Sequence, residues 1–242
     1  MVVWERDRIS TRDSVEIGKP LSGARLREAY TEALPRLTLG LVRFKGNSML
    51  LGPLELHRFG KPTVTRTSVE WPIEGGLLGH AHGGQWRIHA GGGRVEATAT
   101  GYWPRLPRPL YDLTQLQVHL LFTRLFLLGL RERGELPGEQ ATSSDRAAAA
   151  IVDAALCFSL ARFAGRRTPK RVLAVAAVYH VVCWTISGRT LGGAVMRQRV
   201  VSVDGSRLLP QQAALRFLML PLSWIAWRPL HDRIAGTIVI KD

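Results

Sequence analysis

The first 140 residues change from a helical pattern to a strand pattern. Residues 22–34 place Leu26, Tyr30 and Ala33 at helical spacing, which predicts an amphipathic helix. After this helix, apolar and polar residues alternate in short runs separated by glycine pairs, as in half-buried strands. The expected strands are residues 37–44, 48–57, 63–71, 85–90 and 94–102. The residues before the helix are interpreted as a polar stretch without a strand.

A long apolar helix is expected to close this region. Residues 111–131 carry leucine and phenylalanine over a wide arc, interrupted by Gln115, His119 and Arg124. That pattern favours a helix packed against a sheet, or lying on a bilayer, over one that spans it. The sequence therefore predicts an α+β domain over residues 1–138, an antiparallel sheet with a long closing helix. This order of elements resembles the architecture of START-like lipid-binding domains, and we expect the domain to be cytoplasmic.

Three apolar runs follow a polar linker at residues 139–145. They cover residues 147–164, 172–187 and 214–227. Each is shorter than the roughly 20 residues of a perpendicular span, although flanking arginines can reach the headgroups and the bilayer can thin locally. The sequence predicts an α-helical membrane module of two to three spans over residues 146–242.

The distribution of charge supports a membrane partner. The chain has 33 Lys and Arg against 19 Asp and Glu, and residues 146–242, the more apolar part, carry most of the net charge of +14. These cations bracket the apolar runs, as anionic lipid headgroups favour, whereas a nucleic-acid binder spreads them over a polar face. We expect a lipid bilayer with anionic headgroups as partner, a second copy or another membrane protein as a further one, and no nucleic acid.

The N-terminus bears on localisation. Its first residues are charged and lack the apolar core of a cleaved secretory signal. The N-terminal domain is therefore expected in the cytoplasm, while the apolar runs and their flanking cations predict a multi-pass protein of the inner (cell) membrane.

Two aspartates lie in or beside the apolar runs, where removing a carboxylate from water is costly. Asp153 follows Arg146 by seven residues, so the two share a helix face about 10 Å apart along the axis. Asp153 needs a partner from another helix: His180, or Arg233 together with the backbone of the glycine-rich segment after the second run. Asp153 and Asp232 then either pin the helices by hydrogen bonds or form an ion or proton site, and both readings stay open.

The last hundred residues contain four short motifs in a fixed order. They are Arg146 with Asp153; Gly188, Thr190 and Gly192; the basic segment and Asp-Gly turn of 199–205; and His231, Asp232, Arg233, Gly236 and Thr237. In this order they resemble the RDD family of small bacterial membrane proteins, over about residues 145–241. The resemblance implies a helical membrane module linked to ion or small-solute transport. A short, strongly basic first loop departs from the family pattern.

The N-terminal region contains fewer candidate binding or catalytic residues. His80, His82 and His89 are able to meet at a metal ion, but only Glu74 stands nearby as an acidic ligand, so we expect histidines without a metal and no cofactor. Trp71 and Glu74 are candidates for the mouth of a ligand-binding pocket. No nucleophile motif or phosphate-binding loop stands out, so an enzyme is disfavoured. A membrane-anchored ligand-binding, lipid-binding or enzymatic domain remains the alternative function.

Overall fold

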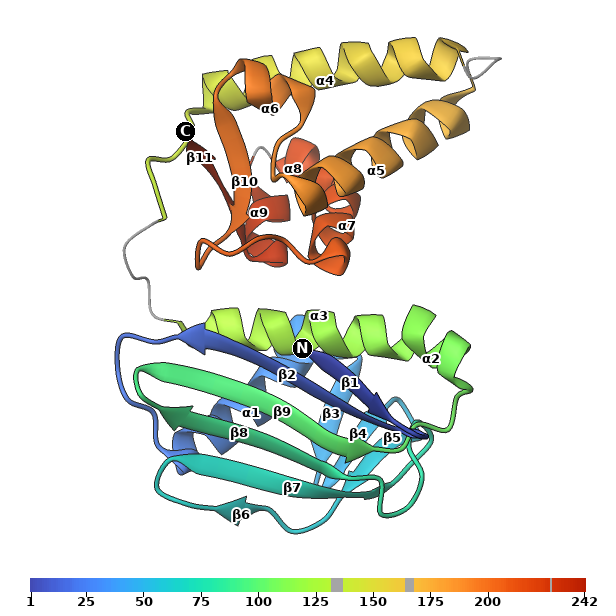
Figure 1. Ribbon diagram of the computed structural model, residues 1–242, viewed down its shortest axis with the longest axis vertical. Helices are drawn as coiled ribbons and strands as arrows, with labels where there is room; N and C mark the ends of the chain where they lie inside the picture. The colour runs from blue at the N-terminus through green and yellow to red at the C-terminus, as the bar shows by residue number, and fades with distance from the viewer. Residues whose placement is uncertain (132–136, 164–167, 227) are drawn as a thin grey trace. The chain divides into compact units, whose positions relative to one another are not determined.

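The chain folds into two compact units, Met1–Gly134 and Glu135–Asp242. The computed structural model describes residues 1–131, 137–163, 168–226 and 228–242. Figure 1 shows a sheet covered by helices in the first unit and a mainly helical second unit. Each unit is described by itself.

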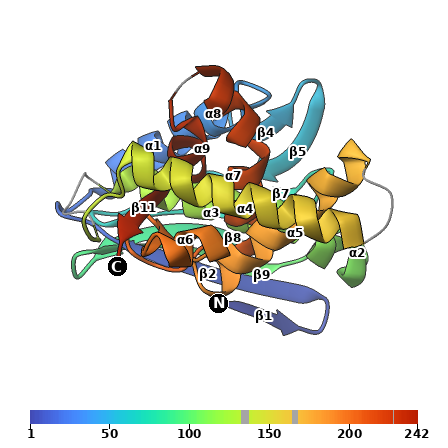
Figure 2. The ribbon, with the colours of Figure 1, turned by 90° about the horizontal axis from the view of Figure 1, so that it is seen from above.

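The N-terminal unit is built on one antiparallel sheet. Its strands are β1 (Val2–Glu5), β2 (Arg8–Glu16), β3 (Val42–Lys45), β4 (Ser48–Leu51), β5 (Leu54–Phe59), β6 (Thr63–Val64), β7 (Ser68–Gly75), β8 (Gln85–Gly91) and β9 (Arg94–Tyr102). They pair in the order β1-β2-β9-β8-β7-β5-β4-β3, and β6 pairs with β7. β1 and β3 form the two edges of this sheet, and Figure 2 shows β1 on the opposite side from β4 and β5.

Three helices accompany the sheet: α1 (Gly23–Leu37), α2 (Arg108–Leu113) and α3 (Gln115–Leu130). The Ser22 hydroxyl caps α1 by accepting a hydrogen bond from the backbone N–H of Arg25 at 3.2 Å. α1 packs on β3, β7 and β8, whereas α3 packs on β2 and β9, and the two helices touch each other. They bury an aromatic cluster in which the Tyr30 ring lies 5.4 Å from Trp71 and 5.3 Å from Phe126. The expected antiparallel sheet with a long closing helix is confirmed.

Several predicted boundaries were wrong for local reasons. The expected strand at 48–57 is two strands, because Gly52 adopts a φ of +57° and turns the chain. The expected helix at 111–131 is broken at Thr114 into α2 and α3. The strands β1 and β2 were missed because β2 buries only two large apolar residues, Ile9 and Val15, among polar ones.

His57 on β5 introduces a titratable group into this core. Its ring centroid lies 5.6 Å from that of Tyr102, and its buried Nδ1 makes no hydrogen bond to the part of the chain that the structure describes. Burial, with a smaller electrostatic contribution from His119, lowers the pKa of His57 from 6.5 to about 4. The folded protein therefore keeps this ring neutral at a pH where the unfolded chain takes up a proton.

We expect the free energy of unfolding to fall as the pH decreases from 6.5 to about 4, because only the unfolded state binds the proton in this window. The loss is roughly 2 kcal/mol at pH 5. His57→Phe should remove this component and raise stability at neutral pH, because it also removes a buried ring nitrogen without a partner. Denaturant unfolding of the full chain in detergent at pH 7.5 and pH 5 measures both effects. The exposed His82→Asn variant is the control, and an unchanged acid sensitivity in His57→Phe would contradict the prediction.

The C-terminal unit combines helices with a two-stranded sheet. Its elements are α4 (Ser143–Phe163), α5 (Pro169–Ile186), α6 (Leu191–Val195), β10 (Gln198–Ser202), α7 (Pro210–Leu218), α8 (Leu220–Ala226), α9 (Leu230–Ala235) and β11 (Thr237–Lys241). β10 and β11 pair antiparallel. α4 contacts α5 and α6, while α7 contacts α5 and α9. A small core that includes Trp184, Leu208 and Ala213 joins these elements.

The expected spans of the C-terminal unit are not confirmed by helix length and composition. Within the described ranges, the one stretch that is long and apolar enough to cross a membrane is Arg108–Leu130. Its most apolar 18 residues have a mean hydropathy of 1.3, and 33% of them are buried. It corresponds to α2 and α3 of the N-terminal unit, where α3 packs on the sheet. The third apolar run is divided between α7 and α8. One such stretch is weak support for a span, since the core helix of a water-soluble domain has the same properties.

Candidate functional site

Asp153 lies at the centre of the C-terminal unit, where α4 meets α5 and α6. It is 5% exposed, and one oxygen, Oδ1, accepts two hydrogen bonds of 2.8 Å, from the Tyr179 hydroxyl and from the Gly192 backbone N–H. The Tyr179 oxygen in turn accepts the Leu191 N–H at 2.7 Å. One side of the carboxylate is thus fixed by two donors from two different elements.

The other oxygen of Asp153 faces a histidine. Oδ2 lies 4.0 Å from Nε2 of His180, which is too far for a hydrogen bond. The second ring nitrogen, Nδ1, lies 2.8 Å from the Ala176 carbonyl oxygen, and because a carbonyl only accepts, Nδ1 carries the proton. In the neutral His180 ring, the lone pair of Nε2 therefore faces a carboxylate oxygen of Asp153.

Asp232 on α9 has a different environment, because two arginines neutralise it. Arg146 of α4 pairs with Oδ2 and Arg216 of α7 pairs with Oδ1. Oδ1 also accepts the Thr237 hydroxyl at 2.8 Å, and that hydroxyl accepts from Arg216 at 2.7 Å. The guanidinium of Arg216 lies over the Trp184 ring, 4.8 Å from its centroid. Asp232 is therefore the centre of a buried ionic network that joins α4, α7, α9 and β11.

His231 extends this network toward α8. Arg146 donates to its Nε2 at 3.1 Å, so Nε2 carries no proton and Nδ1–H donates to the Ser223 hydroxyl oxygen at 2.7 Å. The backbone N–H of His231 reaches the same oxygen at 2.8 Å. The neutral imidazole thus fixes the position of Arg146 beside Asp232.

Two glycines of the second motif, Gly188 and Gly192, allow backbones to approach closely. A Cβ at Gly192 would lie 2.1 Å from the Ala149 carbonyl oxygen, and one at Gly188 would lie 2.7 Å from the Val200 carbonyl oxygen. Between them, the Thr190 hydroxyl caps α6 by accepting the Gly193 N–H at 3.0 Å. In the closing motif, Gly236 ends α9 with a φ of +61°. These residues bring the N–H of Gly192 to Asp153 and turn the chain from α9 into β11.

A pocket of about 910 Å³ connects the two aspartate environments. Asp153, His180, Arg146, Arg216 and His231 line it, together with many apolar side chains from α4, α5, α7 and α8. Carboxylate, imidazole and guanidinium groups therefore meet in a mainly apolar hollow, which is the composition of a ligand site with a few orienting polar groups.

The structure brings together most of the site residues expected from sequence. Asp153 meets His180 and the backbone of Gly192, and Arg146 meets Asp232 rather than Asp153. Arg233 was wrongly expected as a partner of Asp153, because its side chain is exposed on α9. Tyr179 and Arg216 were missed, although a tyrosine next to His180 and an arginine inside the third apolar run were visible signals.

The candidate residues of the N-terminal unit do not form one site. Trp71 is buried in the core, whereas Glu74 and His82 line a surface pocket of about 640 Å³. His80 stacks on Trp103, with ring centroids 4.4 Å apart. The side chain of His89 lies on β8, and no group of three or more His, Cys, Asp or Glu side chains that is able to hold a metal forms within the described ranges.

Comparison with known proteins identifies the C-terminal region. The model of the RDD family matches residues 171–239, which run from α5 into β11. No curated protein and no solved structure matches the chain. The family resemblance drawn from the motifs is confirmed, and Asp232, Arg216 and His180 lie within the match, whereas Arg146 and Asp153 precede it. The C-terminal region of this chain therefore carries a match to the RDD family over residues 171–239.

Proposed function

We propose that the C-terminal unit is embedded in the inner membrane and binds a proton or small cation at Asp153, as a step in ion or small-solute transport. The observation that carries the proposal is the 4.0 Å separation of Asp153 Oδ2 and His180 Nε2 in a mainly apolar pocket, with Nδ1 of the same ring already bound to the Ala176 carbonyl. A small cation placed between the two atoms can be coordinated by both, and a proton bound to either atom removes the repulsion between their lone pairs.

The contrast between the two aspartates supports this assignment. Asp232 is held by two guanidinium groups, so its charge is already compensated. Among the described residues, Asp153 accepts hydrogen bonds from two neutral donors, the Tyr179 hydroxyl and the Gly192 N–H, and pairs with no arginine or lysine. We therefore assign a structural role to Asp232 with Arg146 and Arg216, and a binding role to Asp153 with His180.

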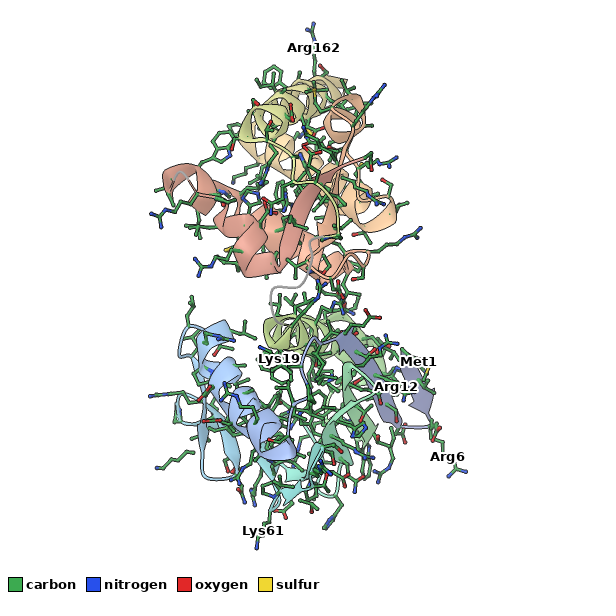
Figure 3. The ribbon with its side chains drawn as sticks, turned by 90° about the vertical axis from the view of Figure 1, so that its left-hand side faces the viewer. Met1, Arg6, Arg12, Lys19, Lys61 and Arg162 are labelled. Atoms are coloured by element: carbon green, nitrogen blue, oxygen red, sulfur yellow. The ribbon has the colours of Figure 1, made fainter. Side chains whose placement is uncertain are left out.

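The outer surface of the C-terminal unit supports its placement in lipid. Large apolar side chains are exposed on α4, α5, α7 and α8, among other helices: Ile151, Phe158, Leu160, Leu173, Val178, Val182, Ile186, Leu218, Leu222, Trp224 and Ile225. So many exposed apolar groups are unfavourable in water and suit contact with acyl chains. At the far end of α4, the Arg162 side chain points away from the unit, where it is able to reach headgroups (Figure 3).

Asp153→Asn is expected to abolish cation-dependent flux in proteoliposomes, because the amide carries no charge and its NH₂ offers no cation ligand. The measurement is the dissipation of a pH or cation gradient across vesicles that contain the full chain. Asp145→Asn is the matched control, because Asp145 lies in the first turn of the same helix and does not line the pocket. Size-exclusion profiles identify a variant that fails to fold. Flux that survives in folded Asp153→Asn removes Asp153 as the site.

The same assay tests the second candidate, a membrane-anchored N-terminal domain that binds a ligand or lipid. Its support is the surface pocket in which Glu74, His82 and Arg58 lie together. Glu74→Gln should leave flux unchanged if transport belongs to the C-terminal unit alone.

A further inference from the structure

The outer side of α2 and α3 is unusually apolar for the surface of a domain. Trp103, Leu106, Leu110, Leu113 and Val118 are all exposed, and Leu113 and Val118 are 76% and 68% exposed. We call these five residues the α2–α3 face. This segment is also the one described stretch whose length and hydropathy suit a membrane.

α3 is apolar on both sides. Its inner side packs on the sheet through Leu116, Phe126 and Leu127, which are buried. On the outer side, the exposed Val118 and the half-buried Leu121 and Leu125 follow one another at helical spacing, while Arg124 between them in the sequence is buried. A surface helix in water is expected to carry polar residues on its outer side, so this side suits an apolar covering.

The rim of the α2–α3 face carries cations and an aromatic ring. The guanidinium of Arg8 lies 5.4 Å from the centroid of Trp103, and Arg105 donates to the Gly79 carbonyl at 3.2 Å. Arg108 lies over Trp4, 4.9 Å from the ring centroid, and its Nε is 3.7 Å from Asp112. Glu5 and Asp7 add negative charge at the β1–β2 turn, which Figure 1 places at the same end of the sheet as α2. Exposed tryptophan and arginine beside leucine match the interface between acyl chains and anionic headgroups.

We propose that the α2–α3 face docks on the surface of an anionic bilayer, so that the N-terminal unit rests on the membrane that holds the C-terminal unit. This rests on the proposed membrane placement of the C-terminal unit. Residues 131–142 connect α3 to α4, and a chain of that length reaches at most about 40 Å even when fully extended. The face is thus kept close to lipid at a high effective concentration, and a weak interfacial contact is sufficient.

The test places an environment-sensitive fluorophore at single cysteines in the full chain, in a Cys157→Ala, Cys183→Ala background. Leu113→Cys reports on the face, Val64→Cys on β6 is an exposed control, and Val178→Cys on α5 reports on embedding. The chain is reconstituted in nanodiscs of phosphatidylcholine with or without phosphatidylglycerol, with spin-labelled lipids as quenchers. We expect emission at position 113 to move to shorter wavelength and to be quenched by lipid, more strongly with phosphatidylglycerol, while position 64 does not respond.

Each outcome separates the two proposals. Quenching at position 178 without quenching at 113 overturns docking and leaves the membrane placement intact. A wavelength shift at 113 without lipid quenching also overturns docking, because it shows that protein, either the C-terminal unit or a second copy, covers the face. No quenching at either position overturns the membrane placement itself. Arg105→Gln with Arg108→Gln should reduce the part of the response that depends on phosphatidylglycerol; an unchanged response overturns the assigned role of these cations.

Discussion

Replacing Arg216 with methionine is expected to destabilise the C-terminal unit by about 3–5 kcal/mol. The Arg216 side chain is 5% exposed and pairs with Asp232, which is 10% exposed. Methionine keeps much of the volume and the contact with Trp184 but removes the charge and the hydrogen bond to Thr237. Asp232 would keep only Arg146 as an ionic partner. Denaturant unfolding of the full chain in detergent, followed by tryptophan fluorescence, measures the loss.

Arg233→Met is the matched control for this prediction. Arg233 lies on the same short helix as Asp232, but its side chain is exposed, so its loss should change stability by less than about 0.5 kcal/mol. The double variant Arg216→Met with Asp232→Leu should recover part of the stability, because no buried carboxylate is then left with a missing partner. Equal losses in Arg216→Met and Arg233→Met would show that the buried network does not hold the unit together.

Gly192→Ala is expected to have the second large effect. The new Cβ would lie 2.1 Å from the Ala149 carbonyl oxygen and 3.0 Å from Cγ of Asp153, so α6 has to move away from α4. That movement breaks the hydrogen bond from the Gly192 N–H to Asp153. Overpacking and the loss of a charge-assisted hydrogen bond together predict a loss of about 3 kcal/mol or more. Denaturant unfolding of the full chain in detergent, followed by tryptophan fluorescence, measures this loss of stability as well.

Ala194→Ser is the control for the glycine variant. Ala194 lies on α6 as well, but it is exposed, so a small polar replacement should be tolerated. We also expect Gly192→Ala to reduce flux even in the fraction that folds, because Asp153 loses one of its two donors. Wild-type stability in Gly192→Ala would contradict the close approach of α4 and α6.

The sequence determined the local structure where the pattern is strong. The period-2 alternation of residues 94–102 predicted β9 with its observed bounds, and the spacing after Ser22 predicted α1. β2 escaped prediction because its neighbour β9 comes some 80 residues later, and the burial of Thr11 depends on that pairing and on α3. A polar strand that is buried by elements distant in the chain lacks the apolar alternation from which a strand is predicted.

The sequence also determined which residues are costly to bury, and therefore that Arg146, Asp153 and Asp232 need partners. Only the tertiary structure decided which partners they have. Arg146 reaches Asp232 across 86 positions of the chain, and Gly192 reaches Asp153 across 39. Arg216 rather than Arg233 completes the ionic network, because α7 turns its arginine inward while α9 turns its own outward. Desolvation is a property of each side chain and its immediate neighbours, whereas compensation of a buried charge depends on the packing of helices that are distant in the chain.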